Sequence, residues 1–151
     1  MKKFLMVLGG LFAVLTVATI GGIFAMKYFG EDLDKESKAY VDANLPQIVG
    51  NWDPRELLDR ASPEFSQVVP QEKVIKLFKI LSQRLGPLKE YKGSAGQSNV
   101  LLNPEGKVIT GDYKADAVFE NGPAKIDFRI IRRDGQWQVL EFWVNSDVLL
   151  Q

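Results

Sequence analysis

The stretch YKADAVFENGPAKIDFRIIRRDGQWQVLEFWV, Tyr113–Val144, decides the fold. It contains three runs rich in β-branched and aromatic residues, which are separated by Asn121-Gly122 and Asp134-Gly135. Such dipeptides adopt positive φ at both central positions of a type I′ turn, the turn that joins antiparallel strands through a two-residue loop. The stretch therefore predicts three strands connected by two tight hairpins.

The register of the first hairpin follows from its turn. A two-residue loop makes Glu120 face Pro123, so that Phe119 pairs with Ala124. Counting onward places the charged residues of both strands on one face, with Val118 as the exception, and the apolar residues on the other. The predicted inward residues are Tyr113, Ala115, Ala117, Phe119, Ala124, Ile126, Phe128 and Ile130. A slip of one residue would invert this separation, so the register is well specified.

The last strand is apolar on both faces. The same count pairs Val139 with Ile130 and turns Glu141 and Trp143 inward. The outward, charged face then carries Leu140, Phe142 and Val144. Because contiguous exposed apolar residues usually mark an interface, we expect a homodimer through this outer sheet face, or a covering segment of the same chain. A bulge near Asp134-Gly135 would turn Glu141 outward, and that alternative stays open.

Composition excludes several classes of function. The 151 residues include no cysteine and no histidine, which removes thiol nucleophiles, zinc sites and Ser-His-Asp triads. All 19 acidic residues, but only 17 of the 19 basic residues, follow the N-terminal apolar run, so the folded part carries a net charge of about −2. A nucleic-acid binder would carry a basic stripe, and none is found. We expect no metal, cofactor or nucleic acid.

The N-terminal part of the chain is one long apolar run. Residues 4–26 contain no charge, and about 20 apolar residues span a bilayer core as a helix. We therefore expect a short tail over residues 1–3, a transmembrane anchor over residues 4–26 and a linker over residues 27–31. A cleaved signal peptide, with secretion of the rest, is the alternative. The very short tail favours a folded domain on the periplasmic side of a bacterial inner membrane.

The residues after the linker predict helices followed by strands. A helix begins near Glu31, and Pro46 should kink it or divide it near Asn44, because proline lacks the amide and clashes one turn back. Further helices are predicted over Pro54–Ala61, Pro63–Val68 and Gln71–Leu85, and an extended segment then turns at Asn103–Gly106. The chain is thus predicted to be α+β over residues 32–151, with helices packed on a curled antiparallel sheet of about four strands.

The run LGPLKEYKG, followed by the hairpins that end in DGQWQVLEFWV, resembles the cystatin-like α+β roll of the nuclear-transport-factor-like superfamily, in particular small bacterial envelope proteins. The resemblance covers about Asp32 to Leu149, and its most recognisable part is Asp134–Val139. It implies a conical cavity between sheet and helices, which ketosteroid isomerases of the superfamily use for catalysis. Tyr113 and Glu141 could supply a hydroxyl and an acid there by character, but neither matches the family's catalytic motif.

These observations favour a membrane-anchored, non-enzymatic accessory, assembly or binding domain of the bacterial envelope. Its expected partners are the bilayer, through residues 4–26, and another envelope protein or a second copy. The alternative is a small-molecule-binding or isomerase- or dehydratase-like pocket protein that uses an inward Glu141. The predicted lining of such a pocket is Tyr113, Phe128, Trp137, Glu141 and Trp143.

Overall fold

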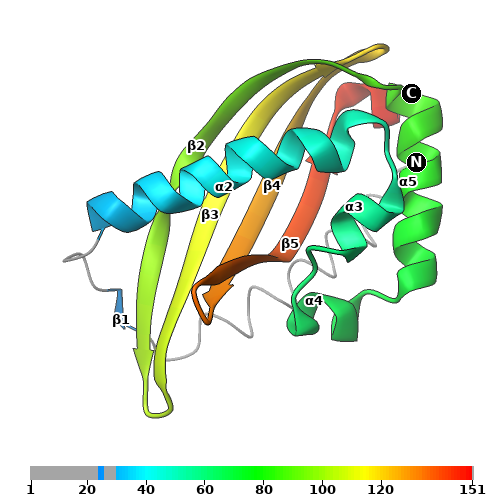
Figure 1. The fold of residues 1–151 in the computed structure, drawn as a ribbon. Coiled ribbons are helices and arrows are strands. Elements are labelled where there is room, and N and C mark those ends of the chain that lie inside the picture. The colour runs from blue at the N-terminus through cyan, green and yellow to red at the C-terminus, as the bar shows by residue number, and fades with distance from the viewer. Residues whose placement is uncertain (1–23, 26–29, 151) are drawn as a thin grey trace.

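The second half of the chain forms an antiparallel sheet in which each strand pairs with the next (Figure 1). The computed structural model describes residues 24–25 and 30–150. Its long strands are β2 (Leu88–Asn103), β3 (Gly106–Phe119), β4 (Gly122–Arg133) and β5 (Gln136–Asn145). A two-residue strand, β1 (Phe24–Ala25), extends the sheet beyond β2, so that the strand order is β1-β2-β3-β4-β5.

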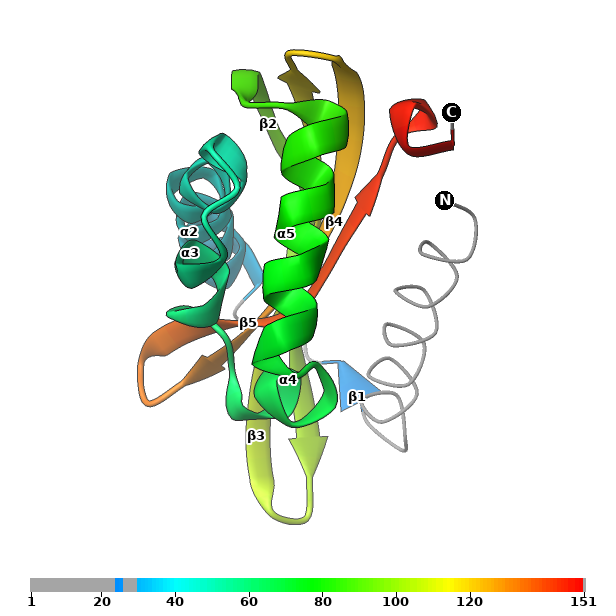
Figure 2. The ribbon, with the colours of Figure 1, turned by 90° about the vertical axis from the view of Figure 1, so that its right-hand side faces the viewer.

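The helices of the described residues lie on one face of this sheet (Figures 1 and 2). They are α2 (Gly30–Gly50), α3 (Pro54–Leu58), α4 (Pro63–Val68) and α5 (Gln71–Leu85), and a short 3₁₀ helix, η1 (Asp147–Leu150), follows the last strand. Helices α2–α5 precede strands β2–β5, which form an antiparallel meander. This order is the predicted α+β arrangement, and the α+β class is confirmed.

The predicted transmembrane anchor lies almost entirely outside the described residues. Its last described residues, Phe24–Ala25, form β1 and pair with Leu102 and Leu101 of β2, so a helical span cannot include them. Within residues 24–25 and 30–150, no helix combines the length and the apolar character needed to cross a membrane.

Helix α2 runs through Pro46 without interruption, so of the two predicted alternatives, a kink or a division near Asn44, the division is wrong. Side-chain amides support the turn that the proline disturbs. Asn44 donates to the Tyr40 carbonyl oxygen at 2.8 Å and Gln47 to the Ala43 carbonyl oxygen at 3.2 Å. Burial of the apolar face on both sides of Pro46 holds the helix together against the loss of one backbone hydrogen bond.

The core lies between the helices and the inward face of the sheet, and Trp52 joins its parts. This residue, at φ 57° after α2, stacks on Phe119 of β3 at 5.2 Å between ring centroids and meets the edge of Phe78 of α5 at 5.4 Å. Its indole N–H donates to the Gly86 carbonyl oxygen at 2.8 Å, at the end of α5. A buried indole thus keeps a hydrogen-bond partner while it packs three elements together.

The first hairpin has the predicted faces but not the predicted pairs. Phe119 pairs with Gly122, so the loop is Glu120-Asn121 and the register differs by two residues from the predicted one. Tertiary hydrogen bonds explain the shift, because the Asn121 amide N–H donates to the Leu85 carbonyl oxygen at 3.0 Å and fixes the loop to the end of α5. A shift of two residues leaves every side chain on its face, and the eight predicted inward residues are all buried.

A bulge in β5 overturns the orientation predicted for the last strand. Ile130 pairs with Val139 and Arg129 pairs with Glu141, so Leu140 is the extra residue. Beyond it Phe142 pairs with the inward Phe128, and Glu141 and Trp143 pair with residues of the outward face. The prediction of an inward Glu141 and Trp143 and an outward Phe142 and Val144 is therefore wrong. The bulge lies five residues beyond Asp134-Gly135, whose positive φ angles, 52° and 77°, fit the predicted turn.

Candidate functional site

The outer face of the sheet carries a depression of about 720 Å³ lined by charged side chains. The bulge in β5 adds Glu141 to its lining by placing this residue opposite Arg129, on the face that holds the charged residues of β3 and β4. Its lining residues are Ala95, Gly96, Gln97, Asp112, Tyr113, Lys114, Asp127, Phe128, Arg129 and Glu141. At Gly96 a Cβ atom would lie 1.9 Å from the Asp112 carbonyl oxygen, so only glycine allows strands β2 and β3 to approach this closely.

Arg129 connects the carboxylates of this depression. Its Nε lies 2.7 Å from Asp112 Oδ1, and its Nη1 donates to Glu141 Oε1 at 3.1 Å. The side chains of Arg129 and Glu141 are only 14% and 6% exposed, whereas Asp112 is 49% exposed. One guanidinium thus pairs with two carboxylates, which leaves a net charge of −1 in the cluster, and Glu141 takes part in an ion pair rather than standing alone as an acid.

Three of the five residues predicted to line one ligand cavity, Tyr113, Phe128 and Glu141, border the depression on the outer face. Tyr113 and Phe128 are 3% and 1% exposed and belong to the core between sheet and helices, against which Trp137 packs. Glu141 and Trp143 belong to the outward face, where they pair with Arg129 and Asp127. Trp137 and Trp143 do not line the depression, which lies on the outer face and is not the cavity predicted between sheet and helices.

The residues predicted to form an outer interface are buried in the chain itself. Phe142 and Val144 lie in the core at 1% and 0% exposure. Leu140, at the bulge, is 1% exposed. A homodimer that uses Phe142 and Val144 as an exposed apolar patch is thus excluded by the observed register.

On the inner face, Tyr113 is held by the first half of α2. Its hydroxyl oxygen lies 2.5 Å from Ser37 Oγ, and it donates to the Asp34 carbonyl oxygen at 3.2 Å. Burial raises the pKa of Tyr113, so the phenol stays protonated through the neutral range. The Tyr113 hydroxyl, which was predicted to contact a ligand, therefore forms hydrogen bonds that connect α2 to β3.

Two further side chains of α2 hold the outer edge of β2. Asp34 Oδ1 accepts hydrogen bonds from the Ser98 amide N–H at 2.7 Å and from Ser98 Oγ at 2.5 Å. Lys38 Nζ donates to the Ser94 carbonyl oxygen at 2.9 Å. At Ser94 and Ser98, which β1 does not pair with, α2 thus occupies two backbone groups that could otherwise pair with another chain.

Asp42 completes this connection between α2 and β2. Its Oδ1 accepts from Tyr91 Oη at 2.7 Å and from Ser94 Oγ at 2.8 Å, and its Oδ2 accepts from Lys38 Nζ at 2.7 Å. Burial alone would raise the pKa of Asp42, but these three hydrogen bonds outweigh it and hold the pKa below its usual value. Burial, with the hydrogen bond to this carboxylate, raises the pKa of Tyr91.

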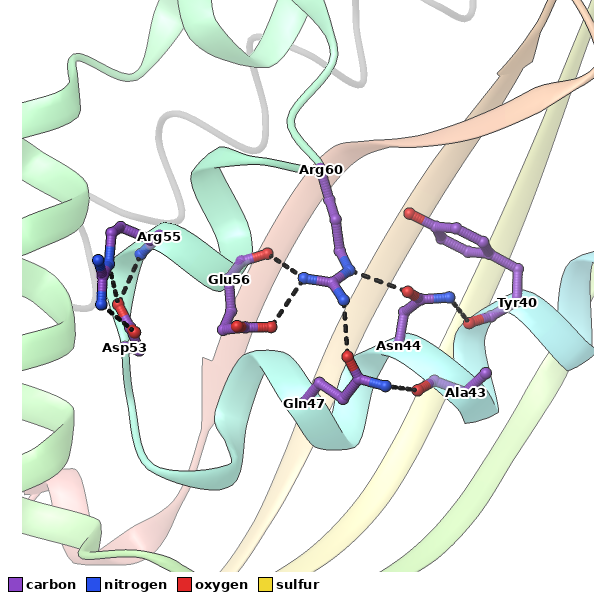
Figure 3. A network of polar contacts seen from close by, with 8 residues as sticks. All are labelled: Tyr40, Ala43, Asn44, Gln47, Asp53, Arg55, Glu56 and Arg60. Carbon is purple, nitrogen blue, oxygen red and sulfur yellow. Dashed lines mark hydrogen bonds and ion pairs between the residues drawn. The ribbon is translucent and has the colours of Figure 1, made fainter.

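A third polar cluster surrounds Arg60 and joins α2 to α3 (Figure 3). The guanidinium Nε donates to Asn44 Oδ1 at 2.9 Å and Nη2 donates to Gln47 Oε1 at 2.8 Å. Nη1 donates both to the Glu56 carbonyl oxygen at 2.8 Å and to Glu56 Oε2 at 2.9 Å. Only a planar fork can reach all these acceptors, so the cluster needs arginine for its geometry as well as its charge.

We expect Arg60→Lys to lower the free energy of unfolding by about 1 kcal/mol, because an ammonium group keeps the charge but cannot donate to all of these half-buried and exposed acceptors at once. Urea denaturation with an unchanged m-value measures this loss. Arg55→Lys is the matched control, since Arg55 is 81% exposed and pairs with neighbouring Asp53, and it should change stability by less than about 0.5 kcal/mol. Equal effects of both substitutions would contradict this role of Arg60.

The described residues offer no metal centre. No cluster of three or more carboxylate, histidine or cysteine ligands with suitable spacing occurs within residues 24–25 and 30–150. The carboxylates of the three clusters instead accept hydrogen bonds or ion pairs from lysine, arginine, serine and tyrosine.

No family model matches the chain, and no curated protein or solved structure showed a significant match to it.

The sequence pattern does not indicate that Arg129, Asp112 and Arg60 organise polar clusters. Alternation predicts Arg129 on the outer face but Glu141 on the inner face, so it does not predict their ion pair, and Asp112 lies before the stretch whose register the turn predicts. The signal for Arg60 is weaker still, because its partners lie 4, 13 and 16 residues away on two helices.

Proposed function

We propose that this protein is a membrane-anchored, non-enzymatic assembly or binding domain of the bacterial envelope, with its folded part on the periplasmic side. One observation carries the proposal: the uncharged segment of residues 4–26 is long enough to span a bilayer even after its residues Phe24 and Ala25, which join the edge of the sheet, are set aside. Without Phe24–Ala25, the segment Phe4–Ile23 still comprises 20 residues and no charge. That length matches the roughly 20 residues that a helix needs to span a bilayer core.

The chemistry of the folded domain supports a role in binding rather than catalysis. The chain contains neither histidine nor cysteine. Glu141, the acid of the alternative pocket hypothesis, lies on the outer face beside Arg129. An isomerase-like or dehydratase-like reaction needs an inward, poorly solvated carboxylic acid, so we do not propose that alternative.

The finer fold that we propose is a cystatin-like roll. The order of elements, with helices α2–α5 before the meander β2–β5, supports this proposal. So does the placement of α2 and α5 against one face of long, bent strands (Figure 1). A fold of this kind does not imply a particular activity. The proposed function therefore rests on the anchor and on the surface residues.

The proposal is tested on the full chain expressed in bacteria. We expect the protein to stay in the membrane pellet after an alkaline carbonate wash, and protease added to spheroplasts to cleave the domain. Detergent extracts should then contain the chain in a complex with an envelope protein or with itself. Release by carbonate would overturn the anchor. A monomer in detergent with no reproducible partner would overturn the assembly role.

A further inference from the structure

The β2–β3 hairpin lies where the chain enters the fold. Strand β1 pairs through Phe24 and Ala25 with Leu102 and Leu101, the residues of β2 just before the turn. Figures 1 and 2 both show this hairpin projecting beyond the rest of the sheet at the end where β1 lies. The position of the hairpin is therefore tied to the position of residue 24.

The surface of the hairpin is partly apolar. Leu102 is 41% exposed, and it is one of three large apolar residues left exposed in the described part of the chain. Pro104, Glu105 and Gly106 form the exposed tip, and Leu101 on the strand is half-buried. The described part of the chain does not bury this leucine beside the turn. An exposed leucine suits the boundary between lipid and water.

We propose that the β2–β3 hairpin is the surface of the domain that faces the bilayer and that its tip lies among the lipid headgroups. This inference rests on the proposed function, because it takes Phe4–Ile23 as the membrane span. Neighbouring strands lie about 4.8 Å apart, so a span that ends at Ile23 brings Leu102 within a few ångströms of the exit point. The headgroup region adds roughly 5–7 Å on each side of the hydrocarbon core, which is enough to hold this strand pair.

The length of β3 places the opposite end of the sheet far from the β2–β3 hairpin and therefore away from the membrane. Glu105 precedes β3 and Glu120 follows it, and this strand has 14 residues. At about 3.3 Å per residue these glutamates are up to roughly 50 Å apart. One hairpin tip can therefore contact lipid while the other remains in water.

The test uses two labels on the full chain, which has no cysteine of its own. Glu105→Cys and Glu120→Cys remove the same charge from two exposed hairpin tips, and each is coupled to an environment-sensitive fluorophore. The proteins are reconstituted into vesicles of phosphatidylcholine and phosphatidylglycerol that contain a nitroxide-headgroup lipid. We expect quenching of the label at position 105 to exceed that at position 120 by at least about twofold, since only the former reaches the headgroups.

The controls separate this inference from the proposed function. Both labelled proteins must resist carbonate extraction from the vesicles; release of both would overturn the anchor and the inference together. Insertion of both with equal quenching would overturn the hairpin's placement and leave the anchor intact. Leu102→Ser in the Glu105→Cys protein should reduce quenching, because it removes the exposed apolar side chain, and unchanged quenching would argue against a lipid contact at Leu102.

Discussion

Replacing Phe142 by alanine is expected to lower the free energy of unfolding by about 3–5 kcal/mol, because it removes a fully buried aromatic side chain and leaves a cavity. Phe142 is 1% exposed and lies between helix and sheet. Its ring centroid is 5.8 Å from that of Phe78 on α5 and 6.3 Å from that of Phe128 on β4. Urea denaturation of the full chain in detergent, followed by near-ultraviolet circular dichroism, measures the loss.

Trp143→Ala is the control that distinguishes the two possible registers of β5. With the bulge at Leu140, Trp143 lies opposite Asp127 and is half-buried, so its loss should cost less than that of Phe142. An uninterrupted strand would turn Trp143 inward and Phe142 outward and would reverse the order of the two effects. A larger loss for Trp143→Ala would therefore contradict the observed register.

Where local signals agree with one another, the sequence alone predicts the structure closely. Helix α5 begins and ends at the predicted residues, Gln71 and Leu85, because its apolar residues recur at three- and four-residue spacing and Gly86 ends it at φ 77°. The faces of β3 and β4 are also as predicted, since alternation fixes them whether or not the exact pairs are known.

The errors arise where contacts between distant segments decide. Asn121-Gly122 favours one loop, but hydrogen bonds from the hairpin to the end of α5 select another. In β5 both faces are apolar, so alternation carries no information about which residues turn inward. The bulge at Leu140 lets Phe142 join the core and Glu141 meet Arg129, and neither gain is visible in the strand's own sequence.

That pairing leads to the second large effect. Arg129→Met is expected to lower the free energy of unfolding by about 3–5 kcal/mol, because it leaves the carboxylate of Glu141 largely buried without its guanidinium partner. Asp112 loses the same partner but is 49% exposed, so water can solvate it and its contribution to the loss is small. Lys114→Met is the control on the same face: Lys114 is 79% exposed and 3.8 Å from Asp127, so the change should be below about 1 kcal/mol.

The double substitution Arg129→Met and Glu141→Leu separates the cost of an unpaired charge from the value of the pair. Two apolar side chains of similar size need no desolvation of charge, so the double variant should be more stable than Arg129→Met alone and lie within about 1–2 kcal/mol of the original protein. Additive losses from the two substitutions would mean that the side chains do not interact, and would contradict the ion pair. A recovered stability would show instead that the outer face of the sheet can dispense with these charges for folding. In that case the double variant still folds, and its affinity for a partner can be compared with that of the original protein to measure what the ion pair contributes to binding.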